Sequence, residues 1–502
     1  MRFHFALLVG AVFGLSAPAQ AQVYAAWTQA NGTFASGAGS SAFVDMNLSL
    51  RVVIETNDPN TSCPAYAARL TRNGMATSEP LAFSKRTNNP DSNRFPVIVC
   101  EAAAPTGVTG FALVQSVTDT SPVTFTDSAS QPVILSAAQR VGASGPPTFV
   151  AFGDTGCRGI YNARGAQECA EDKQKKTKLT KFMFKEVAEQ AAALNPDFVV
   201  HLGDYRYEKE SNRTMDMWDS DFFERVRLGL LAQVPWVFVR GNHEECSLAG
   251  LGWFFFFAAD QSSCGTGKTL YPSWYFDVAD RSAGNANPHR FVIIDTAPTV
   301  HSSGRTHTIA VADMSDAVNA AQSTSSAWFL MHKPLWAVDD YPNPPEQADH
   351  RTGYVLQAAM NAVGSSDCTT YNYQSCGLKA VLAAHLHILQ NSVAVGGALP
   401  QQIVVGNSGV RMDHAVAPQG CSFSMAPLGF GRNNATALVL NVRGRTTRVD
   451  NSAFGFAHFT RDSSVQQSGW AGLAYYVDSA TPQPLGSLSG TASNTRLPCQ
   501  HN

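Results

Sequence analysis

From residue 148 onwards, short apolar runs alternate with stretches of helical character, and this alternation constrains the fold more than any other feature. Seven runs are typical of buried strands: TFVAFGD, DFVVHLGD, WVFVRGN, RFVIIDT, AWFLMHK, KAVLAAHLH and QQIVVGNSG. Helices are expected between them, near 173–193, 216–232, 309–322 and 352–363. Strands that alternate with helices form α/β layers, and ligands bind such sheets at the carboxyl ends of the strands.

The flanking segments have a different character. Residues 23–142 are rich in Ser, Thr, Ala, Val and Pro, and their short apolar runs are separated by turn residues. This pattern favours an all-β, sandwich-like domain. The run VGASGPP is a plausible linker to the α/β domain, which we place at 148–436. We expect 437–502 to be a β extension that closes that domain.

The first 21 residues predict an exported protein. They contain an early Arg, an apolar run and the sequence AQA, which is typical of a cleaved secretory signal. No later run is long enough to span a bilayer, so we expect a secreted or periplasmic chain without a membrane span. Export would allow the ten cysteines to form disulfides. Short loops suggest Cys157–Cys169, Cys246–Cys264 and Cys368–Cys376, which leave Cys63–Cys100 and Cys421–Cys499.

Charge argues against an electrostatic hold on nucleic acid. The formal net charge is −3, whereas nucleic-acid binding surfaces are strongly basic. One dense basic run, DKQKKTKLTKFMFKE, also carries apolar residues at helical spacing. We interpret it as an amphipathic helix with a solvated lysine face.

Polar groups stand where five of the strands end. Taken alone, each is better explained as a turn residue, a helix cap or a core histidine. Taken together, carboxylates, imidazoles, an amide and a phenol are too many ligands for one metal ion. Two ions would need a bridging carboxylate, and such a pair catalyses phosphate-ester hydrolysis. The groups are Asp154, Asp204, Tyr207, Asn242, His243, His332, His385 and His387.

These positions form blocks that resemble the calcineurin-like metallophosphoesterases, and specifically the purple acid phosphatase branch. The blocks are GDTG, GDYRY, GNHE, LMH and AHLH. The resemblance covers roughly 148–412 and implies a layered β-sandwich flanked by helices. It implies that Asp154, Tyr207 and His387 hold a first metal ion. Asn242, His332 and His385 would hold a second, with Asp204 between the two.

The same resemblance implies the chemistry. A metal-bound hydroxide would attack the phosphorus of a phosphate ester, most plausibly a phosphomonoester as in an acid phosphatase. His243 would face the phosphate or protonate the leaving oxygen; the alternative is that it only orients Asp204. The anionic set around Tyr207 suits Fe(III), and the more neutral set suits Zn(II), Mn(II) or Fe(II).

Three departures from the family pattern affect these expectations. Ala384 stands where the last block usually has Gly, which adds a methyl group but keeps both imidazoles. Gly156 stands where the wider superfamily has a His, and Tyr207 takes that role. The His pair that plant members carry after the strand-end His is missing from MHKPLWAVDDYP. Lys333 and His350 are the candidates to replace its charge, although both are more typical of a surface.

Other functions stay open from the sequence. One is a phosphodiesterase with two divalent ions, in which Tyr207 is not a ligand. Another is a secreted binding protein that keeps the site without catalysis. The oligomeric state is not predicted. Within GDYRY, Tyr205 is expected to pack in the turn, and Arg206 is expected to be a solvated loop charge.

Overall fold

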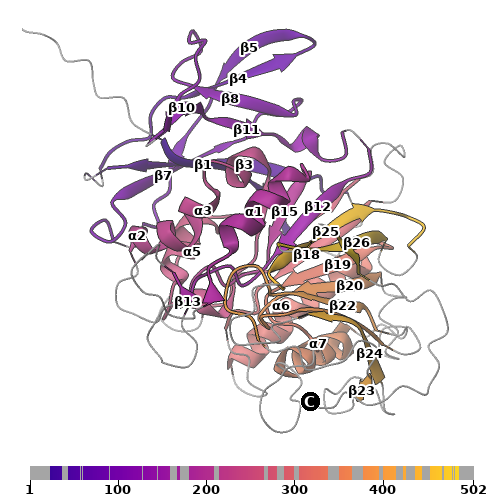
Figure 1. The fold of residues 1–502 in the computed structure, drawn as a ribbon. Helices are drawn as coiled ribbons and strands as arrows, with labels where there is room; N and C mark the ends of the chain where they lie inside the picture. Colours follow the sequence, from indigo (N-terminus) through magenta and orange to yellow (C-terminus); the bar gives the residue numbers. More distant parts are fainter. Residues whose placement is uncertain are drawn as a thin grey trace, which may run out of the picture.

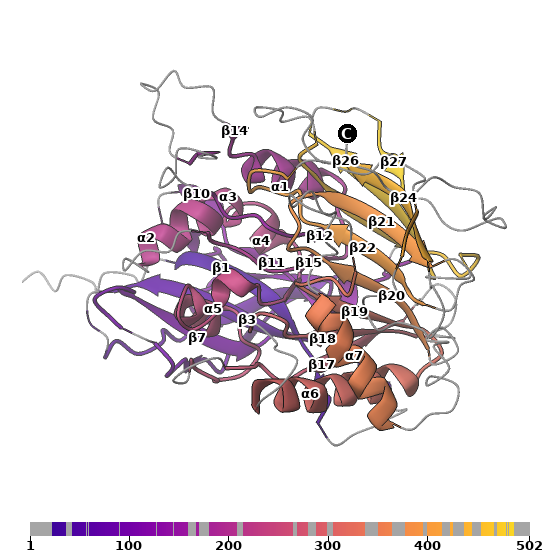
Figure 2. The ribbon, with the colours of Figure 1, turned by 90° about the horizontal axis from the view of Figure 1, so that it is seen from below.

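The structure is a computed structural model of the chain. It describes residues 23–36, 43–56, 58, 60–89, 91–126, 128–143, 145–158, 167–169, 180–207, 214–264, 269–279, 288–298, 305–336, 350–363, 377–394, 399–413, 422–424, 436–443, 453–465, 469–477, 479 and 481–485. Two large mixed sheets lie at the centre, with helices on their outer faces (Figures 1 and 2). The predicted α/β fold, a layered β-sandwich flanked by helices with an N-terminal β region, is confirmed.

The first sheet has twelve strands, which come from residues 23–132, 148–238 and 455–484. Its centre is parallel and consists of β12 (Thr148–Phe152), β15 (Phe198–His201) and β16 (Trp236–Phe238). The other strands are β1 (Val23–Asn31), β3 (Asn47–Glu55), β6 (Ser84–Lys85), β7 (Val97–Ala103), β9 (Thr124–Phe125), β10 (Ser128–Pro132), β25 (Gly455–Arg461), β26 (Trp470–Tyr476) and β27 (Gln483–Pro484). β1 joins β16, and β25 joins β12. The N-terminal and C-terminal β segments therefore extend one sheet from opposite sides.

The second sheet has nine strands, in the order β2-β17-β18-β19-β20-β22-β21-β24-β23. Its parallel centre is β18 (His289–Ile294), β19 (Ala327–Met331), β20 (Leu378–Ala383) and β22 (Gln401–Val405). The remaining strands are β2 (Thr33–Phe34), β17 (Trp274–Val278), β21 (Leu389–Ala394), β23 (Ser422–Ser424) and β24 (Thr436–Arg443). All seven apolar runs predicted after residue 148 are strands of these two sheets, because layers on both faces bury nearly every side chain.

Aromatic side chains fill the space between the two sheets. Phe149 of β12 stacks on Phe198, with ring centroids 5.0 Å apart, and on Phe459, at 4.7 Å. Across the interface it meets Phe291 edge-on at 5.4 Å and Trp328 at 6.0 Å. Burial of rings of this size is the main favourable contribution to sheet packing.

Helices cover the outer faces of the sheets. α6 (Arg305–Gln322) and α7 (His350–Val363) pack on the nine-stranded sheet, in one apolar cluster with Val292, Phe329 and Val381. α1 (Phe184–Ala193) packs on the twelve-stranded sheet, where Phe184 meets Phe152. In α5 (Gly250–Phe256), the run GLGWFFF, every residue except Leu251 is buried in the core. Figure 2 shows α6 and α7 together on one side.

Two predicted helices differ in extent. The helix expected near 173–193 begins at Phe184, because Thr180–Lys181 forms β14 and pairs with β13 (Gln167–Glu168). The basic residues before it lie largely outside the described part of the chain. The helix expected near 216–232 is divided into α2 (Met215–Trp218), a π-helical turn η2 (Asp219–Phe223), α3 (Glu224–Val226) and α4 (Leu230–Gln233). The last break falls at Gly229, whose ψ of −114° is not helical.

The N-terminal segment is divided among three sheets, because β2 (Thr33–Phe34) belongs to the nine-stranded sheet. Besides its strands in the twelve-stranded sheet, it forms a separate sheet of β4 (Ala67–Arg72), β5 (Met75–Pro80), β8 (Gly110–Val114) and β11 (Ile134–Ser136), followed by the 3-10 turn η1 (Ala138–Arg140). Figure 1 shows this small sheet at one end of the molecule. The boundaries 23–142, 148–436 and 437–502 remain a prediction.

Three of the predicted disulfides are formed. They join Cys63 to Cys100, Cys157 to Cys169, and Cys246 to Cys264. Residues 368, 376, 421 and 499 lie outside the described residues, as does the leader at 1–21. None of the helices in the described part combines the length and the apolar character needed to cross a bilayer.

Candidate metal centre

The polar residues at five strand ends converge where the edges of the two sheets meet. They are Asp154 after β12, Asp204 and Tyr207 after β15, Asn242 and His243 in η3 (Asn242–Glu244) after β16, His332 after β19, and His385 and His387 after β20. The carboxyl ends of parallel strands lie at one edge of a sheet, so residues far apart in the sequence become neighbours.

Three of these residues have a left-handed backbone conformation, which residues other than glycine rarely adopt. Their φ angles are 55° at Asp154, 58° at Asp204 and 73° at His385. The other described non-glycine residues with positive φ are Asn73 and Asn195, and asparagine tolerates this region. Such strain concentrates at functional sites, where the surrounding structure enforces it.

Tyr207, Asp154 and His387 form a first group. The Tyr207 hydroxyl lies 2.5 Å from Asp154 Oδ1 and 3.3 Å from His387 Nε2. His387 Nε2 lies 3.8 Å from the same carboxylate oxygen. Asp154 and Tyr207 are buried, and so is His387. Two side chains from one sheet and one from the other thus point their oxygen and nitrogen atoms at a common space.

A second group surrounds His332. Its Nε2 lies 2.9 Å from Asn242 Oδ1 and 3.3 Å from Asp204 Oδ2. Ligand atoms of Asp204, His332 and His385 all lie within 4.8 Å of one another, which is a spacing that suits a metal ion. The backbone N–H of His385 donates to Asp154 Oδ2 at 2.8 Å and so connects the two groups.

The chemistry of the donors in the second group fits a cation. His332 Nδ1 lies 2.8 Å from the carbonyl oxygen of Leu202, to which it donates. In the neutral imidazole the other nitrogen is then an acceptor, and it faces two further oxygen acceptors. A set of acceptors aimed at one point is stable only around a proton or a metal ion, and a carbonyl-held histidine is a common metal ligand.

Charges in the site reinforce this conclusion. Burial opposes ionisation of Asp204, yet His332 and His243 hold the pKa of this carboxyl below its usual range. Burial would likewise lower the pKa of His332, but Asp204 raises it to about 9. Burial raises the pKa of Asp154 to about 7. Without a metal ion, positive charge must come from protonated histidines, and a bound cation would replace it.

His243 lies beside both groups. Its backbone N–H donates to Asp204 Oδ1 at 2.9 Å, and its ring centroid lies 4.5 Å from that of Tyr207. Its Nε2 is 4.0 Å from Asp204 Oδ2, and its side chain keeps partial contact with solvent. Burial lowers the pKa of this imidazole, which favours the neutral ring. The main chain of His243 therefore orients Asp204, while its ring is available at the opening.

Glu244 is a positioning residue that sequence reasoning left without a role. Its fully buried carboxylate accepts four backbone N–H groups, at 2.9 Å from Asp204, 2.9 Å from Tyr205, 3.2 Å from Arg206 and 3.1 Å from Gly241. It thereby ties the loop after β15 to the loop after β16. A Cβ at Gly241 would lie 2.2 Å from Asp204 Oδ1, so this close approach requires glycine.

His201 connects the loops after β12 and β15. Its Nδ1 accepts the N–H of Gly203 at 3.2 Å, so Nε2 carries the proton and donates to the Thr155 hydroxyl at 2.8 Å. Burial lowers its pKa well below the ordinary value, which keeps this neutral tautomer. The Tyr205 ring stacks on the His201 ring, with the ring centroids 3.8 Å apart, and Tyr205 packs in the core as expected. In the sequence, the signal for the role of His201 is that a polar residue ends the apolar run of β15.

Asp413 supports His387 from a loop after β22. Its Oδ2 accepts the N–H of His387 at 3.1 Å and lies 3.4 Å from His387 Nδ1. This leaves His387 Nε2 facing Tyr207 and Asp154. Carboxylates behind metal-binding histidines fix the ring and raise its basicity. Asp413 lies beyond the QQIVVGNSG strand, and nothing in the sequence around it indicates this role.

Two expectations about charged residues are wrong. Arg206 is buried, not solvated, and its guanidinium lies 3.5 Å from Asp221 of η2. The π-helical turn brings that carboxylate over the loop, which the sequence pattern did not reveal. Lys333 is also buried, with its backbone N–H bonded to Thr296. The side chain of His350 lies outside the described residues.

Ala384 fits the site despite its extra methyl group. A Cβ placed on Gly153 would come within 2.3 Å of the Ala384 Cβ. The methyl therefore occupies the space over Gly153, and both imidazoles of AHLH stay at the strand end. The departure at Ala384 is accommodated because the first block has glycine at this contact.

Comparison with known proteins gives the family. Residues 147–389 match the calcineurin-like phosphoesterase family. The purple acid phosphatase PPD1 from yellow lupin (Lupinus luteus) seeds superposes with a TM-score of 0.54 at 12% identity, over 92% of this chain and 74% of that one. PhoD superposes with a TM-score of 0.47 at 10% identity, over 97% of this chain and 96% of that one.

No curated protein sequence matches the chain. At 12% identity, the likeness to the lupin enzyme shows the fold alone. The family match over residues 147–389 covers all five strand ends that carry the metal-centre residues. Residues 147–389 therefore form a domain of the calcineurin-like phosphoesterase family.

Proposed function

We propose that this protein is an exported binuclear phosphoesterase that hydrolyses phosphomonoesters, as an acid phosphatase does. The observation that carries the proposal is the pair of donor groups around Tyr207 and His332, which lie on either side of Asp204 within a calcineurin-like domain. The three disulfides support export, because such bonds persist in oxidising compartments.

Each site residue has a proposed role in metal binding. Asp154, Tyr207 and His387 hold one ion, and Asn242, His332 and His385 hold the other. Asp204 is shared, and Glu244 keeps its loop in register with the loop of Asn242. The two ions, when bound, polarise the phosphate group and lower the pKa of a water molecule.

His243 is the proposed catalytic residue of the protein itself. Its ring lies against Tyr207 and remains partly open to solvent. A neutral imidazole there accepts a hydrogen bond from a protonated phosphate or, once charged, gives its proton to the leaving oxygen. The link from its main chain to Asp204 keeps the ring next to the shared ligand.

The proposed metals are Fe(III) beside Tyr207 and Zn(II), Mn(II) or Fe(II) beside His332. A phenolate, two carboxylates and one imidazole form a hard, anionic set that favours a trivalent ion. The other set is neutral apart from Asp204 and favours a divalent ion.

Turnover tests the function. The metal-loaded protein is expected to hydrolyse p-nitrophenyl phosphate faster than bis(p-nitrophenyl) phosphate, with colour release as the measurement. Chelated protein serves as the matched control and should be inactive. Faster turnover of the diester would favour a phosphodiesterase instead. Absence of turnover with either ester at full metal content would favour a binding protein.

The Tyr207→Phe variant tests the iron assignment. Phenylalanine keeps the ring but removes the oxygen that lies 2.5 Å from Asp154. Iron-loaded wild-type protein is expected to show a visible charge-transfer band from the phenolate, and the variant should lose it completely. Tyr205→Phe is the control, because that hydroxyl bonds to the Val239 carbonyl instead. A band that persists in Tyr207→Phe would contradict the assignment.

A further inference from the structure

Asp295 stands where β18 ends, beside the end of β19 that carries His332. Its buried carboxylate accepts the N–H of Tyr271 at 2.6 Å and the N–H of Ala297 at 2.9 Å. It also forms an ion pair with Arg240, whose Nε lies 3.3 Å from Asp295 Oδ1 and whose Nη2 donates to Oδ2. Protein donors thus occupy the lone pairs of both oxygens, so Asp295 supports the site without offering a ligand atom.

Arg240 reaches this carboxylate from the other sheet. It follows β16 of the twelve-stranded sheet and comes two residues before Asn242. Its buried guanidinium also donates to the carbonyl oxygen of Thr269 and packs on the ring of Phe254, 5.0 Å from the ring centroid. The ion pair therefore joins the two sheets next to a loop that carries a proposed metal ligand.

Thr296, the residue after Asp295, holds the second loop of the same group. Its hydroxyl oxygen accepts the N–H of Lys333 at 2.8 Å, and Lys333 directly follows His332. His332 Nε2 in turn lies 2.9 Å from Asn242 Oδ1. Two consecutive residues at the end of β18 thus hold the two loops whose side chains meet around the second metal position.

A buried ion pair fixes geometry more than it adds stability. Removing the two charges from water offsets most of their attraction. The planar guanidinium, however, meets a carboxylate in only a few orientations, so the pair sets the distance between the segments that carry it. Asn242 and His332 come from different sheets, and their spacing depends on where those sheets are joined.

We propose that Asp295 and Arg240 are positioning residues, which set the spacing of Asn242 and His332 for the second metal ion. This inference rests on the proposed function. Residues that orient metal ligands typically change metal affinity when they are altered, although they do not touch the ion. The run RFVIIDT thereby has a role as well, because its Asp and Thr end a strand beside the ligands and hold their loops.

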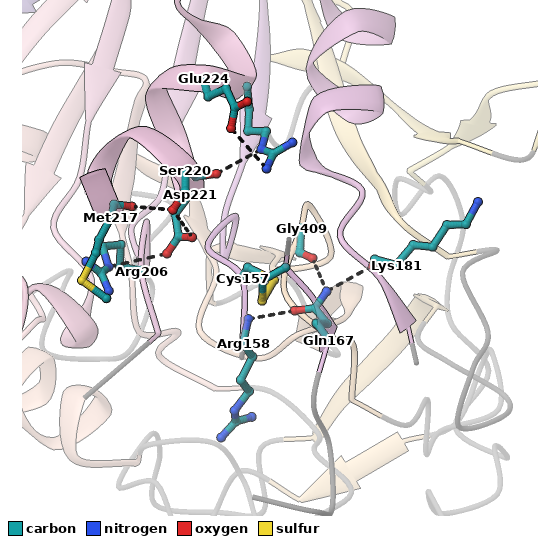
Figure 3. The surroundings of a disulfide bond; sticks show 12 residues. Cys157, Arg158, Gln167, Lys181, Arg206, Met217, Ser220, Asp221, Glu224 and Gly409 are labelled. Carbon is teal, nitrogen blue, oxygen red and sulfur yellow. Dashed lines mark hydrogen bonds and ion pairs between the residues drawn. A yellow bond between two sulfur atoms is a disulfide. The ribbon is translucent and has the colours of Figure 1, made fainter. Parts of the chain in front are cut away.

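The first donor group is held by a separate set of contacts. The buried side chain of Gln167 accepts the N–H of Arg158 at 3.0 Å and donates to the Gly409 carbonyl at 2.8 Å (Figure 3). The next residue, Val410, donates its N–H to the carbonyl oxygen of Asp154 at 2.8 Å. Loss of the ion pair between the sheets should therefore spare the first group.

Titration of Zn(II) into the iron-loaded Asp295→Asn variant tests the proposal. Its dissociation constant for Zn(II) is expected to rise about 10- to 100-fold. Turnover of p-nitrophenyl phosphate should fall at limiting Zn(II) and largely recover in excess Zn(II). The visible band of the iron bound by Tyr207 should be unchanged, because that ion lies in the first group.

Asp277→Asn is the matched control. Asp277 forms the same kind of buried ion pair with Arg290, at 2.7 and 2.8 Å, and Arg290 stands at the opposite end of β18. This variant should lose stability as Asp295→Asn does, yet bind Zn(II) as the wild type does. An equal loss of Zn(II) affinity in both variants would reduce the effect to general destabilisation and overturn the proposal.

Thr296→Val tests the same spacing without disturbing the ion pair, and it serves if Asp295→Asn does not fold. It removes one acceptor, so the dissociation constant for Zn(II) should rise about three- to tenfold. Thr296→Ser keeps the hydroxyl and should bind Zn(II) as the wild type does.

The outcomes separate this inference from the proposed function. Wild-type Zn(II) affinity in Asp295→Asn or in Thr296→Val would refute the positioning role alone, while turnover by the wild type would still support the function. Loss of the iron band together with Zn(II) in Asp295→Asn would also contradict a role confined to the second ion. If the wild type binds no Zn(II), the proposed function fails, and the positioning role fails with it.

Discussion

Replacing Asp204 by asparagine is expected to lower kcat by about 10³-fold or more and to release at least one of the two metal ions. The carboxylate lies 3.3 Å from His332 Nε2, and we propose that both ions share it. An amide offers one neutral oxygen, so it cannot hold two cations. Loss of several kcal/mol of charge stabilisation corresponds to this factor, at about 1.4 kcal/mol for each tenfold change.

The fold should survive this change. The asparagine Oδ1 can still accept the N–H of His243, which now lies 2.9 Å from Asp204 Oδ1. Metal analysis and chromogenic turnover are the measurements, and Asp216→Asn on the exposed face of α2 is the matched control. Retention of both ions by Asp204→Asn would show that Asp204 is not shared between them.

Replacing Glu244 by glutamine is expected to destabilise the metal-loaded protein by about 2–4 kcal/mol and to weaken metal binding about 10- to 100-fold. The two side chains have almost the same shape, so the effect is not one of packing. The amide group would point its own N–H donors at two of the four backbone N–H groups that the carboxylate now accepts. Those donors would be buried without partners, and the Asp204 loop would shift.

Chemical denaturation and metal titration measure the two effects. Glu186→Gln, at an exposed position of α1, should change stability by no more than about 0.5 kcal/mol. If Glu244→Gln is as stable as the wild type and binds metal equally well, the carboxylate does not hold the two loops as inferred. In Gly241→Ala, the added methyl group would collide with Asp204 and should therefore disturb the same two loops.

Much of the fold was predictable because burial leaves a direct mark on the sequence. The seven strands of the α/β region are apolar runs, as strands covered on both faces must be. The three described disulfides are among the pairs that cysteine spacing suggested, although spacing alone does not fix the pairing. The start of α1 at Phe184 was not predictable, because pairing of β14 with β13 overrides the helical pattern before it.

The candidate site was predictable to a different extent. Asp154, Asp204, His332 and their companions could be named because each follows an apolar strand, and parallel strands end together. Their supporting residues could not. Arg206 is buried because Asp221 arrives from a π-helical turn. Asp413 stands behind His387 because a loop folds back over the strand ends. These contacts depend on loop paths, and loop residues carry no periodic signal.

The sequence by itself therefore determined the layered α/β architecture and the set of residues that gather at the strand ends, since these depend on local hydrophobic pattern and chain order. Only the tertiary structure decided that the flanking β segments extend the same sheet, and that Glu244 and His201 tie the site loops together. The reason is physical. A strand is specified by its own side chains, whereas a hydrogen bond between two loops requires both of their paths through space.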